Sequence, residues 1–225
     1  MQKLAIIVAG GSGSRMGSSV PKQFLPLAGR PILMHTIQLF ADVPDCRVVV
    51  VLPDSQVDFW RQLCSSHSFT TTHEVVTGGS TRHASVSNGL ALLRDEPLVA
   101  VHDGVRPLVD PLTIVRCFDE AAQFGSAIPV MPATESVRIV SGNGSSHAVD
   151  RNDVMLVQTP QVFRSDVITK AYSLPYSPLF TDDASVVEAA GFSVHLAQGN
   201  IENIKITRPA DMIFAEALFA AQSKK

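Results

Sequence analysis

Residues 8–24 read VAGGSGSRMGSSVPKQF and follow directly after the apolar run at residues 4–7. A glycine-rich loop that comes right after a buried strand is typical of α/β domains that bind phosphate groups. Glycine has no side chain, so the backbone N–H groups of such a loop can approach an anion closely. Arg15 and Lys22 place two positive charges beside the loop. The stretch therefore predicts an α/β fold whose first loop holds a phosphorylated ligand.

The two commonest phosphate-binding motifs do not fit this loop. A dinucleotide-binding loop requires G-x-G-x-x-G, and Met16 stands where the third glycine is needed. A P-loop requires a glycine directly before its lysine, and here Pro21 precedes Lys22. Two cations beside the loop favour a triphosphate that is attacked at its α-phosphorus, because charge grows on the phosphate oxygens and on the departing pyrophosphate. A tight turn with two solvated basic residues is the alternative.

Short β-branched runs alternate with amphipathic helical patterns along the rest of the chain. Strands that are apolar on both faces and are separated by helices indicate a mostly parallel sheet with helices on both sides. No linker or repeat divides the chain, so we expect one Rossmann-like α/β domain over residues 1–225 with a twisted sheet. The predicted strands are 4–8, 46–52, 98–102, 127–131, 193–197 and 204–207, and the predicted helices are 31–40, 57–64, 82–93, 111–124, 181–190 and 209–221.

The segment 136–150 breaks this alternation. A strand-like run at 136–140 is followed by the turn cluster 141–146 and by a second short run that ends at Asp150. This pattern predicts a β-hairpin. A hairpin that projects from an α/β body is often an interaction arm, and an ordinary edge ribbon of the sheet is the alternative.

The composition limits the class of protein. The chain has 225 residues, 45% of them hydrophobic, and a formal net charge of −3. These values suit a packed domain and argue against a general nucleic-acid binder. Three cysteines without CxxC spacing disfavour a disulfide framework or a zinc site. The apolar runs are too short to cross a bilayer and the N-terminus lacks the pattern of a signal peptide. We therefore expect a cytoplasmic protein.

The stretch HDGVRP at residues 102–107 contains a second candidate site. Asp103 ends an apolar strand, which is where open α/β sheets bind ligands. A carboxylate there can hold Mg²⁺ together with phosphate oxygens, and Arg106 can meet an anionic substrate. A helix or turn cap is the alternative role for Asp103. We expect His102 to be a packed histidine at the strand end and not a catalyst.

Two further stretches offer weaker signals. Gly79 and Ser80 lead to Arg82 at the start of a predicted helix, and such a corner presents backbone groups and a guanidinium to a ligand. A Gly-Gly turn with a helix cap is commonplace, however. Lys205, in the stretch NIKITRP, and Arg151, after the hairpin, are either ligand-binding cations or solvated surface residues.

The motifs together resemble a known family. The chain resembles 2-C-methyl-D-erythritol 4-phosphate cytidylyltransferases in six stretches, which occur in the right order and extend over nearly the whole chain. These stretches are AGGSGSRMG, PKQFLPLAGRPIL, HDGVRP, LVQTPQVF, TDDAS and ENIKITRP. The resemblance implies a CTP-dependent enzyme of non-mevalonate isoprenoid synthesis that uses Mg²⁺ or another divalent cation. In this family the acceptor phosphate attacks the α-phosphorus of CTP and pyrophosphate leaves. The resemblance also implies a homodimer that is joined by an arm at about residues 133–152.

The resemblance assigns roles to matching residues. The positions that match catalytic residues are Arg15, Lys22, Arg151 and Lys205. Those that match the CTP site are Ala9, Gly10, Gly11, Ser12, Gly13, Lys22, Gly79, Ser80, Arg82 and Ser85. Those that match the acceptor site are Asp103, Gly104, Arg106, Ser136, Arg151, Thr159, Thr181 and Lys205, with Asp103 also the metal-associated aspartate. The family dimer implies that Arg106, Ser136 and Arg151 serve the site of the partner subunit.

Several positions depart from the commoner family pattern and leave alternatives open. The loop has Ala-Gly-Gly where Ala-Ala-Gly is common, Ser80 replaces an aspartate, and Ser136 stands where threonine is frequent. Some of these departures also resemble ribitol-5-phosphate cytidylyltransferases of wall teichoic acid synthesis, so ribitol phosphate is the alternative acceptor. A nicotinamide oxidoreductase is a second alternative, against which the missing third glycine argues. A non-catalytic nucleotide-binding module is a third.

Overall fold

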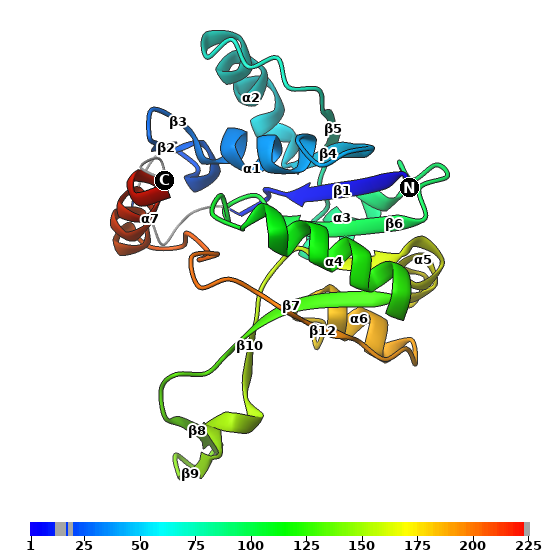
Figure 1. Ribbon diagram of the computed structural model, residues 1–225, viewed down its shortest axis with the longest axis vertical. Helices are drawn as coiled ribbons and strands as arrows, with labels where there is room; N and C mark the ends of the chain where they lie inside the picture. Colours follow the sequence, from blue (N-terminus) through cyan, green and yellow to red (C-terminus); the bar gives the residue numbers. More distant parts are fainter. Residues whose placement is uncertain (12–16, 18–19, 223–225) are drawn as a thin grey trace.

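The structure is a computed structural model that describes residues 1–11, 17 and 20–222. Within these residues, an eight-stranded sheet has the order β10-β7-β11-β6-β1-β4-β5, with β12 paired to β7 (Figure 1). The strands of this sheet are β1 (Lys3–Val8), β4 (Cys46–Leu52), β5 (Glu74–Thr77), β6 (Leu98–Asp103), β7 (Ser126–Pro132), β10 (Met155–Val157), β11 (Gln161–Arg164) and β12 (Leu196–Gln198).

The sheet is mostly parallel, as the sequence predicts. β1 pairs in parallel with β4 and β6, β4 with β5, and β7 with β12. β11 runs antiparallel between β6 and β7, and β10 runs antiparallel along the outer side of β7. The buried runs of β1 and β4 are apolar on both faces because the strands lie in the middle of the sheet with helices above and below.

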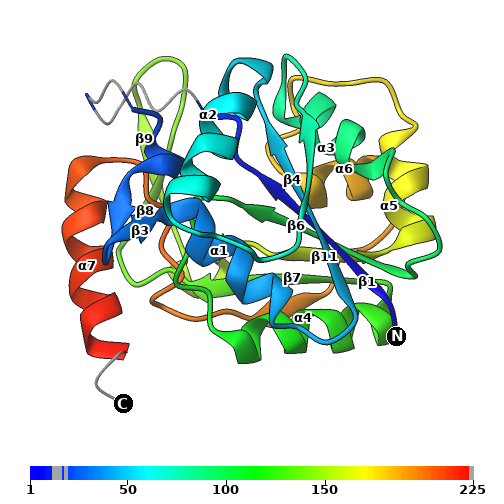
Figure 2. The ribbon, with the colours of Figure 1, turned by 90° about the horizontal axis from the view of Figure 1, so that it is seen from above.

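Helices cover both faces of the sheet (Figure 2). Side chains of α1 (Ile32–Ala41), α2 (Asp54–Ser66) and α4 (Pro111–Phe124) pack on one face in a single apolar cluster. Side chains of α3 (Arg82–Leu90), α5 (Ser165–Tyr172) and α6 (Asp183–Ala189) pack on the opposite face in a second cluster. The expected α/β layering is therefore confirmed. None of the helices in the described ranges is long and apolar enough to cross a membrane.

A third apolar cluster attaches the C-terminal helix α7 (Pro209–Gln222) to the body. Ala215 of α7 packs with Ile206 and with Val105 and Leu108, which follow β6. Leu27 and Ile32, around the small ribbon of β2 (Pro26–Leu27) and β3 (Arg30–Pro31), complete the cluster. The cluster fixes the segments on either side of Lys205 and Arg106 against one another.

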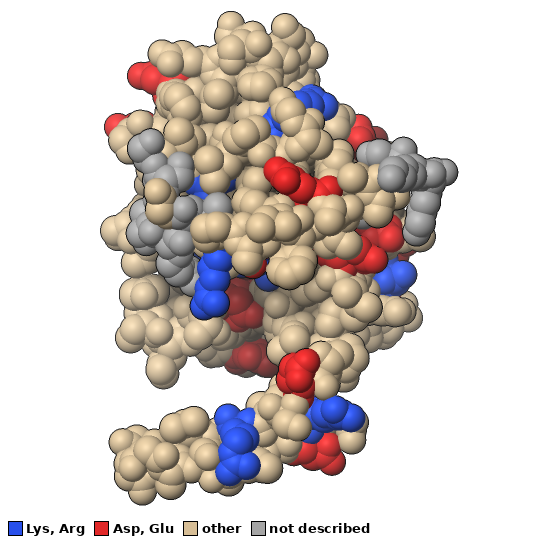
Figure 3. Space-filling model, turned by 90° about the vertical axis from the view of Figure 1, so that its left-hand side faces the viewer, with Lys and Arg blue, Asp and Glu red and all other residues tan. Residues whose placement is uncertain are grey.

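The predicted hairpin is present. β8 (Val137–Val140) pairs antiparallel with β9 (Ser146–Val149) in a sheet of its own, so it is not an edge ribbon of the main sheet. The hairpin, its flanking chain and the short helix η3 (Arg151–Asp153) stand off from the body between β7 and β10 (Figures 1 and 3). We call residues 133–152 the arm. Its exposed side chains include Ile139 and Val140, which are 52% and 69% exposed.

The structure corrects several predicted elements. Residues 204–207 alternate apolar and polar side chains like a strand, but they form an irregular segment held by Ile206 N–H donating to the Val105 carbonyl. The predicted strand at 193–197 is reduced to β12, the helix at 57–64 begins earlier at Asp54, and that at 82–93 ends at Leu90. The elements in the described residues that the sequence does not predict are β2, β3, β5, β10, β11, α5 and the short helices η2 (Lys22–Phe24) and η3.

Candidate active site

The candidate site lies at the carboxyl ends of the central strands. Val8, the last residue of β1, pairs in register with Asp103 at the end of β6 and with Val51 of β4. From β1 the chain runs outward through β4 to β5 on one side, and then returns through α3 to β6 on the other side of β1. Ligands of open α/β sheets bind outside the carboxyl ends of the strands, at the switch point where the strand order reverses.

A pocket of about 300 Å³ opens at this edge of the sheet. Its walls come from the start of the glycine-rich loop, the short helix η2 (Lys22–Phe24), the turn before α3, the end of β6 and the segment before α7. The expected site residues that line it are Ala9, Gly10, Gly11, Lys22, Gly79, Ser80, Arg82, Ser85, Asp103 and Lys205. Stretches that are far apart in the sequence therefore meet around one cavity.

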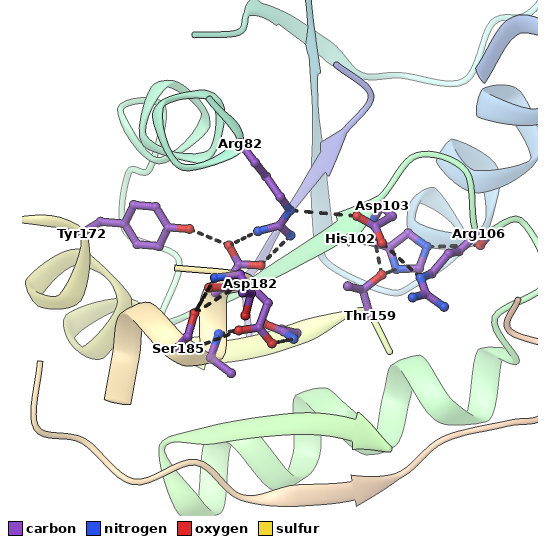
Figure 4. A network of polar contacts seen from close by, with 12 residues as sticks. Arg82, His102, Asp103, Arg106, Thr159, Tyr172, Asp182 and Ser185 are labelled. Atoms are coloured by element: carbon purple, nitrogen blue, oxygen red, sulfur yellow. Dashed lines mark hydrogen bonds and ion pairs between the residues drawn. The ribbon is translucent and has the colours of Figure 1, made fainter. Parts of the chain in front are cut away.

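Asp103 is surrounded by cations in this pocket (Figure 4). Its Oδ2 atom lies 3.0 Å from Lys205 Nζ and 3.1 Å from Arg106 Nε, and its Oδ1 atom lies 4.0 Å from Arg82 Nε. Burial alone raises the pKa of the Asp103 carboxyl, but the attraction of Lys205, Arg82 and Arg106 outweighs burial and holds that pKa well below its usual range. Asp103 therefore remains an anion at neutral pH.

Arg82 is oriented by a carboxylate from a distant part of the chain. Its Nη1 and Nη2 atoms donate to Asp183 Oδ1 and Oδ2 at 2.9 Å and 2.7 Å, and the Asp183 side chain is completely buried. The Tyr172 hydroxyl, at the end of α5, donates to Asp183 Oδ1 at 2.5 Å. Burial and the neighbouring Asp183 raise the pKa of Tyr172, so its hydroxyl stays a neutral donor. The sequence marks Asp183 only as a helix opener and gives no sign of Tyr172.

Lys22 and Gln23 shape the side of the pocket next to the glycine-rich loop. Lys22 is only 8% exposed, and its Nζ atom donates to the Ile206 carbonyl at 3.1 Å. Gln23 Nε2 donates to the Ala9 carbonyl at 2.8 Å and to Gln56 Oε1 at 2.6 Å. Gln23 thereby ties the first residue of the loop to α2. The sequence analysis does not single out Gln23, although it lies in the quoted motif PKQF.

Ser85 organises the opposite side of the pocket. The Gly79 N–H donates to Ser85 Oγ at 3.1 Å, and the Ser85 hydroxyl donates to the Thr81 carbonyl at 2.9 Å. A side chain at Gly79 would collide with Ala84, so only glycine allows the turn to lie this close to α3. The Thr81 side chain caps α3 by accepting from Ala84 N–H.

Thr159 and His102 lie directly behind Asp103 (Figure 4). The Asp103 N–H donates to Thr159 Oγ1 at 3.1 Å, Thr159 Oγ1 lies 3.0 Å from His102 Nδ1, and His102 Nε2 lies 3.1 Å from the Arg106 carbonyl. Burial lowers the pKa of His102 to about 4. The side chain is fully buried, which confirms the expected packed histidine. Gly104 completes this turn by donating to the Val8 carbonyl at 2.9 Å.

Arg106 contacts Asp103 of its own chain, and its Nη1 atom donates to the Asn203 carbonyl at 2.7 Å. The turn at 103–106 folds back on itself, with Arg106 N–H donating to the Asp103 carbonyl at 3.1 Å. The expectation that Arg106 serves the site of a partner subunit stays a prediction.

Six expected acceptor-binding residues are not among those that line the pocket: Gly104, Arg106 and Thr159, whose contacts around Asp103 are given above, and Ser136, Arg151 and Thr181. Ser136 and Arg151 belong to the arm, and both are exposed. Arg151 Nη1 donates to the Thr134 carbonyl at 3.0 Å. Thr181 is an exposed residue just before α6, and its N–H donates to Ser185 Oγ at 3.1 Å. Ser12, Gly13 and Arg15, which were also expected in the site, lie outside the described residues.

The sheet and the cation-rich pocket at its switch point define an α/β protein that binds a phosphorylated ligand. The family model for 2-C-methyl-D-erythritol 4-phosphate cytidylyltransferase matches residues 3–221. The chain belongs to this family and is a nucleotidyltransferase enzyme, which confirms the resemblance in its motifs.

Similar proteins carry the same description. Two curated proteins named 2-C-methyl-D-erythritol 4-phosphate cytidylyltransferase are each 51% identical to the chain. The alignment with the protein from Bacteroides fragilis covers 97% of this chain and 100% of the relative. The alignment with the protein from Porphyromonas gingivalis covers 98% of this chain and 99% of the relative. A crystal structure of that enzyme from Thermus thermophilus is 32% identical, with a TM-score of 0.77 and coverage of 97% and 98%. The structure of a 4-diphosphocytidyl-2C-methyl-D-erythritol synthase from Anaerococcus prevotii is 26% identical, with a TM-score of 0.83 and the same coverage.

Proposed function

We propose that this chain transfers the cytidylyl group of CTP to 2-C-methyl-D-erythritol 4-phosphate and forms 4-diphosphocytidyl-2-C-methyl-D-erythritol and pyrophosphate. The observation that carries the proposal is the pocket at the ends of β1 and β6 that is lined by Lys22, Arg82, Lys205 and Asp103, with Arg82 and Lys205 paired to Asp103. Family membership supports the identity of both substrates. In the proposal, residues 1–225 act as one cytoplasmic nucleotidyltransferase domain.

The nucleotide side of the pocket lies between the glycine-rich loop and the turn before α3. We assign the triphosphate to Gly10 and Gly11, where exposed backbone can approach an anion, and to Lys22 beside them. Ser12, Gly13 and Arg15 join this role because they match the family motif. The base and ribose are assigned to the remaining wall, whose residues are Ala9, Gly79, Ser80, Arg82 and Ser85.

Asp103 suits a divalent cation that is bound together with phosphate groups. In the residues that the structure describes, no three His, Cys, Asp or Glu side chains converge, so the protein alone does not form a complete metal cage. Mg²⁺ takes one or two carboxylates and fills its other positions with phosphate oxygens and water. Asp103 would hold the metal, which supplies charge neutralisation at the phosphates when it is bound.

The acceptor phosphate is assigned to the cations on the other side of Asp103. Lys205 lies at the pocket mouth and Arg106 lies behind it, and both contact Asp103 Oδ2. Gly104 and Thr159 belong to the backbone turn beneath them. The other proposed acceptor contacts are Ser136, Arg151 and Thr181.

The chemical step is a direct displacement. An oxygen of the acceptor phosphate forms a bond to the α-phosphorus of CTP, and the bond from that phosphorus to the oxygen bridging to the β-phosphorus breaks, so that pyrophosphate leaves. No enzyme nucleophile is required, because the acceptor phosphate is itself the nucleophile. The protein has to align two polyanions and neutralise their charge. Lys22 and Arg15 are assigned to the triphosphate, and Lys205 and Arg151 to the acceptor.

The arm is proposed to join two copies of the chain. Its hairpin exposes the apolar side chains of Ile139 and Val140, and the projecting arm also carries basic and acidic side chains (Figure 3). Exposed apolar surface on a projecting ribbon favours association. In a homodimer the arm would place Ser136 and Arg151 at the acceptor end of the partner's pocket. Ser136 and Arg151 would then be supplied by the other subunit.

The test of the function is pyrophosphate release with CTP and Mg²⁺, measured separately with methylerythritol phosphate and with ribitol phosphate. We expect turnover with methylerythritol phosphate. Turnover with ribitol phosphate alone would retain the reaction type and overturn the acceptor. CTP binding without turnover with either acceptor would favour a nucleotide-binding module.

A further inference from the structure

The side chain of His102 lies behind the pocket and contacts Thr159 and Arg106 through hydrogen bonds. Its side chain is fully buried, it is not among the residues that line the pocket, and its ring packs 4.8 Å from the ring of Phe40. Both ring nitrogens have polar neighbours: Nδ1 faces the Thr159 hydroxyl at 3.0 Å, and Nε2 faces the Arg106 carbonyl at 3.1 Å (Figure 4). His102 therefore has neighbours on both sides of the turn that carries Asp103.

The partners of the ring determine where its proton lies. A backbone carbonyl can only accept a hydrogen bond, so Nε2 must carry a proton that it donates to Arg106 O. The Thr159 hydroxyl already accepts from Asp103 N–H at 3.1 Å. Its own proton then points to Nδ1, which is an acceptor in the neutral Nε2–H form of the ring. With this assignment, the Asp103 N–H, the Thr159 hydroxyl, the His102 ring and the Arg106 carbonyl are joined in one continuous chain of hydrogen bonds. Buried polar groups are normally hydrogen-bonded in this way.

The chain of hydrogen bonds closes around the turn between Asp103 and Arg106. One end holds the Asp103 N–H through Thr159, and the other holds the Arg106 carbonyl directly. The side chains of the same two residues meet in the site, with Arg106 Nε donating to Asp103 Oδ2 at 3.1 Å. A shift of the turn would move the carboxylate and the guanidinium, because both side chains belong to the residues whose backbone groups are held.

We propose that His102 is a positioning residue for the acceptor half of the reaction: its two ring nitrogens fix the backbone of the turn that places Asp103 and Arg106. The inference rests on the proposed function, because that function assigns the acceptor phosphate to this end of the pocket. His102 does not act on the reacting atoms. It acts through the geometry of the turn, and geometry errors of about 1 Å in a reacting assembly can cost about 100-fold in rate.

The kinetic test compares two substitutions of His102. His102→Phe keeps an aromatic ring beside Phe40 but removes both ring nitrogens. His102→Gln supplies one donor and one acceptor, as the Nε2–H ring does. We expect His102→Phe to lower kcat/KM for the acceptor phosphate by about 10- to 100-fold. Equilibrium binding of CTP in the absence of a divalent cation should stay unchanged, and His102→Gln should recover most of the loss.

Two results would overturn the proposal. One is a His102→Phe enzyme with the acceptor kcat/KM of the original chain. The other is a parallel loss of CTP binding and acceptor kcat/KM in both variants, since that is what general damage to the fold produces. Turnover by the unsubstituted chain is measured first. If the unsubstituted chain is inactive with both acceptors, the proposed function is contradicted. The position of the proton on the His102 ring is then tested by a measurement that needs no activity.

That measurement is ¹⁵N NMR of the imidazole groups in the unsubstituted chain. The resonance pair that disappears in His102→Gln is assigned to His102. We expect it to report a proton on Nε2 and an unprotonated Nδ1. A proton on Nδ1 with an unprotonated Nε2 would contradict the hydrogen-bond chain, because the Arg106 carbonyl would then face a second acceptor.

Discussion

Arg82 and Asp183 are 101 residues apart in the chain, and they form a two-point ion pair with distances of 2.9 Å and 2.7 Å. The pair joins the first turn of α3 to the first turn of α6, and Tyr172 from α5 supports the carboxylate from the far side. A bidentate pair fixes the plane of the guanidinium as well as its position. The direction in which Arg82 enters the pocket is therefore set by residues that do not line it.

We predict that Asp183→Asn weakens CTP binding. Without the buried carboxylate, Arg82 keeps Asp103 as its nearest anion, 4.0 Å away, and should turn toward it. Breaking a buried pair by removing one partner also costs about 3–5 kcal/mol of stability. Tyr172→Phe is the milder companion, because it removes one hydrogen bond to a charged group, worth about 1.5–3 kcal/mol. Calorimetry on the folded variants measures their affinity for CTP. An unchanged affinity in both variants would show that the Arg82–Asp183 pair stabilises the fold but does not orient Arg82 for CTP binding.

Lys22→Ala is expected to lower kcat by about 100- to 1,000-fold, the range found when a group that stabilises transition-state charge is removed. Lys22 also donates to the Ile206 carbonyl, so the alanine variant could loosen the segment before α7. Lys22→Met keeps the length of the apolar stem and removes only the charge. Single-turnover rates should fall equally in both variants. A methionine variant that is nearly as fast as the original enzyme would assign Lys22 a packing role.

Arg151→Ala is expected to raise KM for the acceptor phosphate and to leave CTP binding unchanged, because Arg151 lies on the arm and away from the pocket lining. If the arm completes the partner's site, mixing Lys22→Ala chains with Arg151→Ala chains restores activity at acceptor concentrations below the raised KM. Random pairing gives half heterodimers with one complete site each, so about a quarter of the original sites should return. Activity that does not rise above the two separate variants would place Arg151 in its own chain's site or outside any site.

The free energy of unfolding should fall between about pH 6.5 and 4 because of His102. Burial is the largest cause that lowers the pKa of His102 from 6.5 to about 4. The positive charges of Arg106 and Lys205 also lower this pKa, whereas the negative charge of Asp103 raises it. In this window the unfolded chain binds a proton that the folded chain does not, so stability is lost as pH decreases, by up to about 3 kcal/mol. The free energy of unfolding can be measured by urea denaturation at several pH values in this range, and it should depend less steeply on pH for His102→Gln than for the original chain. The same pH dependence in both would mean that the His102 ring is not shielded from protons.

The central sheet can be predicted because its strands are apolar on both faces. The sequence predicts β4 and α4 with the same bounds as the structure has. It does not predict β11, because the four residues of that strand include Gln161 and Arg164 and do not form an apolar run. Residues 204–207 alternate like a strand, but Ile206 is drawn into the cluster beneath α7 and the backbone pairs with Val105 and Lys22 instead of with a strand.

The half of the site that can be predicted lies at the ends of strands. Lys22 follows the glycine-rich loop and Asp103 ends an apolar strand. A charged residue at the carboxyl end of a buried strand indicates a ligand site even without a structure. Asp183, Tyr172 and Gln23 act through contacts made across the fold, and their local sequence shows only a helix cap, an aromatic residue and a polar residue after a lysine. The role of His102 likewise depends on Thr159, from a strand connection 57 residues away.

The most direct measurement is pyrophosphate release from CTP with Mg²⁺ and methylerythritol phosphate, with ribitol phosphate as the matched control. We predict turnover with methylerythritol phosphate, a much lower rate with ribitol phosphate, and loss of the turnover with methylerythritol phosphate in Lys22→Met. Turnover with ribitol phosphate alone would contradict the assigned acceptor, and full activity of Lys22→Met would contradict the assigned chemistry of the pocket.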